Sequence, residues 1–224
     1  IKIYNDAYRP ILGDKHPQSM GQAARACWPE IWHIIGPMLE GVLLRGEATW
    51  SENQLLFLER RGFSEECYFT FSYSPIRNES GGVGGVFCAV TETTGNVLGE
   101  RRLRTLRDLA ACAATIRSEQ ETWKSLIETL TDNRHDIPFA LLYRADSDHT
   151  RAHLAGALRM EAGGAHAPFT IDLSAGEDVL WSLSRVASED KPVLLEEMPI
   201  QGSSQSALVL PLARPGISAY GFLI

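Results

Sequence analysis

The sequence lacks long apolar segments and paired cysteines. No apolar run approaches the roughly 20 residues that span a bilayer, and no secretory signal peptide is visible. The cysteines are Cys27, Cys67, Cys88 and Cys112, and no two of them form a Cys-x-x-Cys pair. Each lies in an apolar or helical run, where a free cysteine behaves as a small apolar residue. We therefore expect buried thiols in a reduced, cytoplasmic protein that makes no membrane contact through this chain.

Motifs for phosphate binding and for hydrolysis are also missing. The glycine-rich stretch 81–85 has no following Lys-Ser/Thr and lies between predicted strands, unlike a phosphate-binding loop. The Gly-x-Ser-x-Gly pattern of many serine hydrolases does not occur. The acidic residues are scattered, and no two of them are set apart to work as acid and base. We predict that this chain carries no catalytic residues.

Charge and histidine spacing exclude two further classes of site. The formal net charge is -7, and an acidic domain repels the phosphates of a nucleic acid. His149 and His153 are four residues apart, but their segment alternates like a strand, which would separate them by about 13 Å. No cysteine or carboxylate frames them in a zinc spacing. We expect no nucleic-acid partner, no metal site and no cofactor in this chain.

The pattern of apolar residues divides the chain into helical and strand-forming parts. Residues 1–46 are predicted as a short strand followed by helices, the last of them over residues 29–44. A period of two then indicates three strands joined by short turns, at residues 49–60, 65–76 and 83–92. Residues 97–132 are predicted to be helical, with a new helix starting at Ser118. A second block of strands and helices follows, so the fold class is α+β, with two antiparallel sheets joined by a long helix.

A stripe on this long helix predicts an interface. Leu103, Leu106, Ala110 and Ala113 are spaced at three, four and three residues, close to a heptad seam. The small alanines would let two helices approach closely, so we expect a homodimer through this helix. The alternative is that the stripe packs back onto the first sheet of the same chain.

Aromatic residues gather at one further position. Trp28 and Trp32 are four residues apart and would cover one face of a helix, with His33 beside them. Core packing of a small domain explains this composition. The alternative is the wall of a small-molecule pocket with His33 as its polar group, because ligand pockets are mostly apolar.

Particular segments of the first half resemble a PAS domain that lacks its first strand. The segment Trp28-Pro29-Glu30-Ile31-Trp32 is similar to PAS domains of bacterial hybrid histidine kinases, and so are residues 69–76. Residues 85–94 look like the usual last PAS strand. The cysteine pattern of PAS domains that bind flavin covalently is absent around Cys27, which argues against a photoreceptor.

The second half resembles a GAF domain, on residues 138–144 and 207–212. The closing strand and helix expected of such a domain are not recognisable, and both chain ends lie inside apolar runs, so we expect an excised piece. The resemblances imply a PAS-like domain at 1–96, a connecting signalling helix at 97–118 and a truncated GAF-like domain at 119–224. No cysteine follows Cys112, which argues against a bound bilin.

The two resemblances together imply a sensory module of a histidine kinase in a two-component phosphorelay. The expected partners are a second copy of the chain, the kinase core and response-regulator domains of the parent protein, and a small-molecule ligand. The parent kinase would use ATP and Mg, but the chain itself lacks a histidine box and ATP-binding motifs. The alternative output is a cyclic-dinucleotide enzyme or a transcription regulator.

Overall fold

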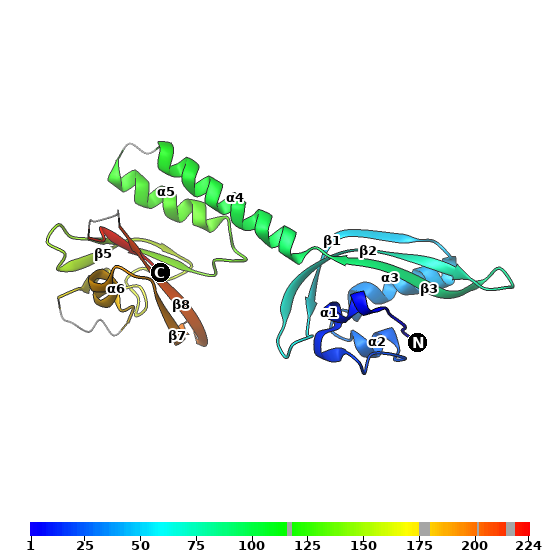
Figure 1. The fold of residues 1–224 in the computed structure, drawn as a ribbon. Helices are drawn as coiled ribbons and strands as arrows, with labels where there is room; N and C mark the ends of the chain where they lie inside the picture. Colours follow the sequence, from blue (N-terminus) through cyan, green and yellow to red (C-terminus); the bar gives the residue numbers. More distant parts are fainter. Residues whose placement is uncertain (116–117, 175–179, 201, 214–217) are drawn as a thin grey trace. The chain divides into compact units, whose positions relative to one another are not determined.

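The structure is a computed structural model that describes residues 1–224 except residues 116–117, 175–179, 201 and 214–217. It divides into two compact units, Ile1–Arg101 and Arg102–Ile224. Each unit contains one sheet, and all strand pairs in the described residues are antiparallel. The predicted α+β class, with an antiparallel sheet and flanking helices in each unit, is confirmed (Figure 1).

The first unit consists of short helical turns, one longer helix and a three-stranded meander. Its helical elements are η1 (Asp6–Tyr8), α1 (Arg9–Leu12), η2 (Gly13–Lys15), α2 (Ala24–Cys27) and α3 (Trp32–Arg45). Its strands are β1 (Thr49–Leu58), β2 (Glu65–Arg77) and β3 (Val83–Glu92), in the order β1-β2-β3. The three predicted strands therefore match the observed ones closely, because alternation and turn residues are local signals.

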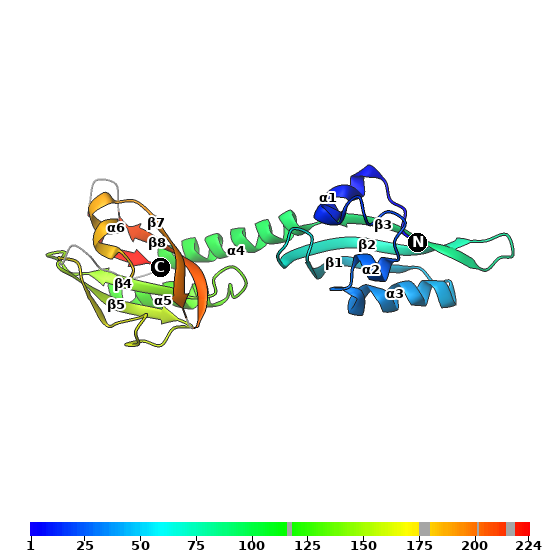
Figure 2. The ribbon, with the colours of Figure 1, turned by 90° about the horizontal axis from the view of Figure 1, so that it is seen from below.

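One face of the meander forms the core of this unit. Cys67, Phe69, Phe71 and Tyr73 alternate along β2 and are all buried. Helix α3 packs against β2 and β3, and the short N-terminal helices complete the cover (Figure 2). The opposite face is more open, since Trp50 of β1 and Phe87 of β3 are largely exposed.

Several local expectations for this unit are wrong. The predicted N-terminal strand does not form; instead Lys2 exchanges backbone hydrogen bonds with a loop, donating to Gln22 and accepting from Gly21. Helix α3 begins three residues after Pro29 and continues through Pro37. Cys88 is exposed rather than buried.

Two helices follow the meander. Helix α4 (Thr94–Thr115) begins two residues after β3, and α5 (Glu119–Thr131) follows it. The predicted break at Ser118 is present: the Ser118 hydroxyl accepts a hydrogen bond from the backbone N–H of Glu121 at 3.3 Å, which caps α5. The division between units falls inside α4, after Arg101.

The second unit is built on a six-stranded sheet of order β6-β5-β4-β9-β8-β7. Its strands are β4 (Ala140–Ala145), β5 (Arg151–Leu158), β6 (Thr170–Asp172), β7 (Val193–Ile200), β8 (Ser203–Leu212) and β9 (Gly221–Leu223). Helix α6 (Leu183–Glu189) lies between β6 and β7 in the chain. The last strand, β9, pairs with both β4 and β8.

Both faces of this sheet are covered. Ala140 of β4 packs with Leu130 of α5 on one face, whereas Leu141 packs with Leu183 and Val186 of α6 on the other. Alternation along β4 sends successive side chains to opposite faces, so a strand covered on both sides reads as a continuous apolar run. Figure 1 shows α5 and α6 on the two sides of the sheet. In the part of the chain that the structure describes, no helix is long and apolar enough to cross a membrane.

Candidate functional site

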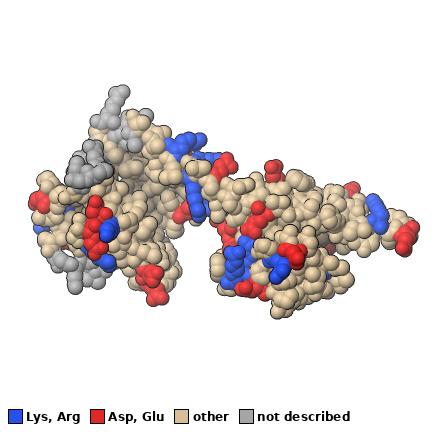
Figure 3. All heavy atoms as spheres, in the orientation of Figure 1, with Lys and Arg blue, Asp and Glu red and all other residues tan. Residues whose placement is uncertain are grey.

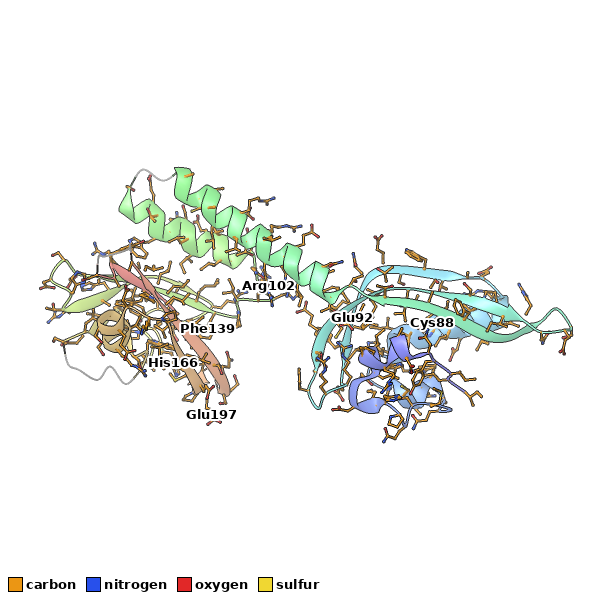
Figure 4. The ribbon with its side chains drawn as sticks, in the orientation of Figure 1. Cys88, Glu92, Arg102, Phe139, His166 and Glu197 are labelled. Carbon is orange, nitrogen blue, oxygen red and sulfur yellow. The ribbon has the colours of Figure 1, made fainter. Side chains whose placement is uncertain are left out.

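A buried arginine lies at the point where the meander passes into α4. Arg60, in the turn after β1, is 4% exposed. Its two terminal nitrogens donate to the two carboxylate oxygens of Glu92, each at 2.8 Å. Glu92 is the last residue of β3, two residues before α4 (Figure 4). A bidentate pair of this kind fixes both the distance and the orientation of its partners.

The same arginine contacts two other parts of the unit. Its Nε lies 3.4 Å from each carboxylate oxygen of Glu65, at the start of β2. Its backbone carbonyl accepts a hydrogen bond of 2.8 Å from the N–H of Asp14. Arg60 therefore joins the N-terminal helical segment, β2 and the end of β3 in one hydrogen-bonded cluster.

The first two turns of α4 are attached to this cluster and to β2. The Thr94 hydroxyl donates to Glu92 at 3.0 Å and accepts from the backbone N–H of Tyr68 at 2.9 Å. Two turns further, Arg101 donates to Glu66 at 2.8 and 3.2 Å. We call these contacts, made by Arg60, Glu65, Glu66, Tyr68, Glu92, Thr94 and Arg101, the β3–α4 junction.

Charge pairing perturbs the ionisation of the junction. The hydrogen bonds from Arg60 lower the pKa of Glu92 below its usual range, and the Thr94 hydroxyl acts in the same direction. The bonds to Glu92 and Glu65 raise the pKa of Arg60 despite its burial. Both groups are therefore charged at neutral pH, and removing Glu92 would leave the buried Arg60 with the longer contact to Glu65 as its ion pair.

The stripe predicted on α4 is presented to solvent on that helix. Leu103 and Leu106 are 68% and 62% exposed, and Ala110 is exposed too. The side chain of Ala113 lies outside the described residues. The opposite face of α4 is the one that packs, because Leu109 contacts the Leu130 cluster and Thr105 accepts a hydrogen bond from Asn133 at 3.0 Å.

Basic side chains surround the stripe. The run Arg101, Arg102, Arg104 and Arg107 follows the start of α4, and Figure 3 shows blue side chains gathered over this helix. Arg107 pairs with Asp108 at 2.8 Å, whereas Arg101 pairs with Glu66 on β2.

The predicted aromatic site takes another form in the structure. Trp28 is 4% exposed, and its Nε1 donates to the Tyr8 hydroxyl at 3.3 Å. Trp32 is partly buried against the same core, and Gly36 lies against its ring. His33 is exposed. A cavity of about 300 Å³ lies nearby, but its lining residues include Cys27 and Pro29 rather than these three.

The interior of the second unit is filled by its own side chains. Trp181 and Tyr143 are fully buried; the Trp181 Nε1 donates to the His166 carbonyl at 2.9 Å, and the Tyr143 hydroxyl donates to the Pro168 carbonyl at 2.9 Å. A separate cavity of about 280 Å³ lies beside β8 and β9 and is lined mainly by apolar residues.

The described residues contain no cluster of three or more His, Cys, Asp or Glu side chains that could hold a metal ion. His149 and His153 do not share a strand face, because His149 lies in the turn before β5 with φ of 55°. His153 instead contacts Asp146, with 2.9 Å between Nε2 and Oδ1.

Sequence reasoning did not find the β3–α4 junction. From the sequence, Arg60 and Glu92 are only the last residues of two predicted strands, at residues 49–60 and 83–92. A signal was present in the sequence. Arg60 is a basic residue next to a turn, Glu65 begins the following strand and Glu92 ends the third, and an antiparallel meander brings these three positions to the same edge of the sheet. Their pairing depends on the register between strands, which residue spacing alone does not specify.

Comparison with known proteins assigns no family. No protein-family model matches the chain, and no curated protein matches it. Among solved structures, a GAF domain of a phosphoenolpyruvate-protein phosphotransferase from Acinetobacter is similar at 17% identity and TM-score 0.41, covering 55% of this chain and 74% of its own.

Two further solved structures are similar to the chain. The nlh2 GAF domain of A. aeolicus matches at 8% identity and TM-score 0.42, over 56% of this chain and 78% of its own. A bacteriophytochrome chromophore-binding domain from R. palustris matches at 9% identity and TM-score 0.33, over 77% and 64%. At such identities and TM-scores these likenesses assign neither a family nor a function.

Proposed function

We propose that this chain is a sensory and regulatory module of PAS-then-GAF type, which relays the state of its first unit along α4 to a histidine kinase core in the parent protein. The chain itself performs no chemistry in this proposal. Its task is to convert a change in the first unit into a change in the position of a helix.

The β3–α4 junction carries the proposal. The first turns of α4 are held by the Thr94 hydroxyl and by the Arg101–Glu66 pair. The Thr94 hydroxyl also donates to Glu92, which is paired with Arg60. A shift of β3 or of the turn that carries Arg60 must therefore break these contacts or move α4. Packed helices have discrete arrangements, so a small displacement of this kind can act as a switch.

The exposed stripe supplies the second element, a self-association surface. Leu103 and Leu106 are exposed on α4 in the single chain. Burying a leucine contributes about 1.5–3 kcal/mol, so two copies of each in a paired helix would support a modest dimer. Rotation of α4 at the junction would then change the seam between two chains.

The test is sedimentation of the purified chain and of Leu103→Glu/Leu106→Glu. We expect a wild-type dimer at tens of micromolar and a folded, monomeric double variant, because four buried carboxylates would destabilise the seam. Leu44→Glu is the matched control, since Leu44 is 83% exposed and belongs to a different helix, α3 of the first unit. It should remain dimeric.

Two results would contradict the proposal. A monomeric wild-type chain would mean that the stripe does not form a seam between two copies. The same conclusion would follow if the stripe were found packed onto the sheet of its own chain. A double variant that stays dimeric would place the interface elsewhere.

A further inference from the structure

A lysine amine lies against a buried cysteine sulfur in the first unit. The Nζ of Lys2 lies 3.0 Å from the Sγ of Cys27, and the Ser19 hydroxyl lies 3.2 Å from the same sulfur. Cys27 is 3% exposed and forms the end of α2, whereas Lys2 comes from the N-terminal segment. These three residues do not belong to the β3–α4 junction.

The fold holds the lysine in this position from two directions. Backbone hydrogen bonds with Gly21 and Gln22 fix the segment that carries Lys2. The ammonium lies 4.7 Å from the centre of the Tyr8 ring and 4.9 Å from that of Trp28, distances at which a cation is attracted to an aromatic face. The amine is thus directed at the sulfur.

The surroundings favour reaction between the two groups. Burial lowers the pKa of the Lys2 ammonium below its ordinary value, so more of the amine is present in the neutral, nucleophilic form. Cys27, Ser19 and Lys15 are among the residues that line the cavity of about 300 Å³. A molecule as small as hydrogen peroxide can reach a cysteine that borders a cavity of this size.

We propose that Lys2 and Cys27 form a peroxide-sensitive pair that becomes covalently cross-linked on oxidation. In the first step hydrogen peroxide oxidises the Cys27 thiol to a sulfenic acid, and one water is released. In the second step the neutral Lys2 amine attacks the sulfenic sulfur. An N–S bond forms, the S–O bond breaks, and the hydroxyl leaves as water with a proton from the amine. One peroxide is consumed and two waters are formed.

The cross-link would close a covalent loop between the N-terminal segment and α2. The thiol is oxidised and the peroxide reduced, and a dithiol reductant reverses the bond, as it does other sulfenyl derivatives. The Lys2–Cys27 pair can exist whether or not α4 relays a signal, so this inference goes beyond the proposed function. Dimerisation and cross-linking are measured separately and can fail separately.

The experiment treats the folded chain with hydrogen peroxide, alkylates the remaining thiols and maps tryptic peptides by mass spectrometry without reductant. We expect a product that joins the peptide of residues 1–15 to that of residues 26–45, two hydrogen atoms lighter than their sum. Cleavage after Lys2 should be blocked, because an N-substituted lysine is not a trypsin site. Dithiothreitol should release both peptides.

Two variants separate the proposed reaction from simple oxidation. Lys2→Arg keeps a cation near the sulfur but lacks the amine nucleophile, so its Cys27 should accumulate as a sulfenic acid that dimedone captures. Lys15→Arg is the matched control, because Lys15 lies near Cys27 but bonds to its carbonyl and to Glu30 instead of the sulfur; it should cross-link like the wild type.

The cross-link is sought directly in the wild-type chain, so the result does not depend on how well a variant folds. Cys27 that remains a free thiol after peroxide treatment would overturn the proposal. So would sulfenic or sulfinic acid at Cys27 of the wild-type chain without the joined peptide.

Discussion

The replacement Glu92→Gln tests whether the Arg60–Glu92 pair holds the β3–α4 junction together. The substitution keeps the shape of the side chain but removes its charge. The buried guanidinium of Arg60 then keeps its longer contacts, to Glu65 at 3.4 Å and to the carbonyls of Pro10 and Ile11 at 3.4 and 3.5 Å. Breaking a buried ion pair costs about 3–5 kcal/mol. The Glu92 side chain is 28% exposed, and Glu65 still contacts Arg60 in the variant. We therefore expect the free energy of unfolding of the first unit to fall by about 2–3 kcal/mol.

Hydrogen exchange monitored by mass spectrometry measures this loss in the first unit alone. A loss of 2–3 kcal/mol corresponds to roughly 30- to 150-fold faster exchange of the most protected amides of β2. Exchange in the first two turns of α4 should accelerate as well, since Thr94 bonds to Glu92. Amides of the second unit should be unaffected.

Arg61→Gln provides the matched control. Arg61 neighbours Arg60 and pairs with Glu65 at 3.3 Å, but its side chain is 56% exposed. Exposed pairs contribute about 0–1 kcal/mol, so exchange of β2 should change less than about fivefold. If Glu92→Gln changes exchange no more than Arg61→Gln does, the junction is not a stabilising contact and our reasoning about α4 fails.

The sign of the pH dependence follows from the same pair. The folded-state pKa of Glu92 is lowered, so the stability that it contributes is complete above its unfolded pKa and is lost as pH falls through the folded one. The stability difference between the wild type and Glu92→Gln should therefore be full at pH 7 and shrink below about pH 4. A difference that persists unchanged at pH 2–3 would contradict this assignment.

Three further predictions concern packing and thiol chemistry. Gly156→Ala should destabilise the second unit by about 1–3 kcal/mol in urea unfolding, because an added Cβ would clash with Ile127; no effect would mean that α5 adjusts freely. Trp181→Ala should lower the free energy of unfolding of the second unit by about 3–5 kcal/mol, because the ring is fully buried. A decrease below about 1 kcal/mol would mean that the interior around Trp181 is not tightly packed. Cys88 is exposed as a residue, but neighbouring groups partly desolvate its thiol and raise the thiol's pKa to about 11. Iodoacetamide should therefore label Cys88 slowly at pH 7 and faster as pH rises, while buried Cys67 stays unlabelled in the folded chain; equal rates would refute this.

Local patterns predicted the elements of the first unit well. Alternation along residues 65–76 and the glycine-rich turn before residue 83 specify a meander, because strand period and turn chemistry act over a few residues. The break at Ser118 was predicted for the same reason, since a capping box is a local motif. The short strand predicted at the start of the chain does not form, because Lys2 exchanges backbone hydrogen bonds with a loop at Gly21 and Gln22 rather than with a strand.

The second unit was harder to predict where local signals conflict. Ser174 and Glu177 have the spacing of a capping box, which favours a helix starting there. Residues 175–179 lie outside the described residues, and α6 begins later, at Leu183. Ser182 has φ of 55°, which interrupts a helix at that point. Strand β6 was not predicted, since three residues are too few to show a period.

The sequence by itself determined the α+β class, the meander, the two helices after it and the apolar stripe of α4, because each depends on neighbours within a few positions. Only the tertiary structure showed that Arg60 meets Glu92, residues 32 positions apart, and that Lys2 meets Cys27, 25 positions apart. Such pairs are set by strand register and by the path of the loops. No periodic pattern in the sequence links the members of these pairs, so their contacts could be found only from the folded structure.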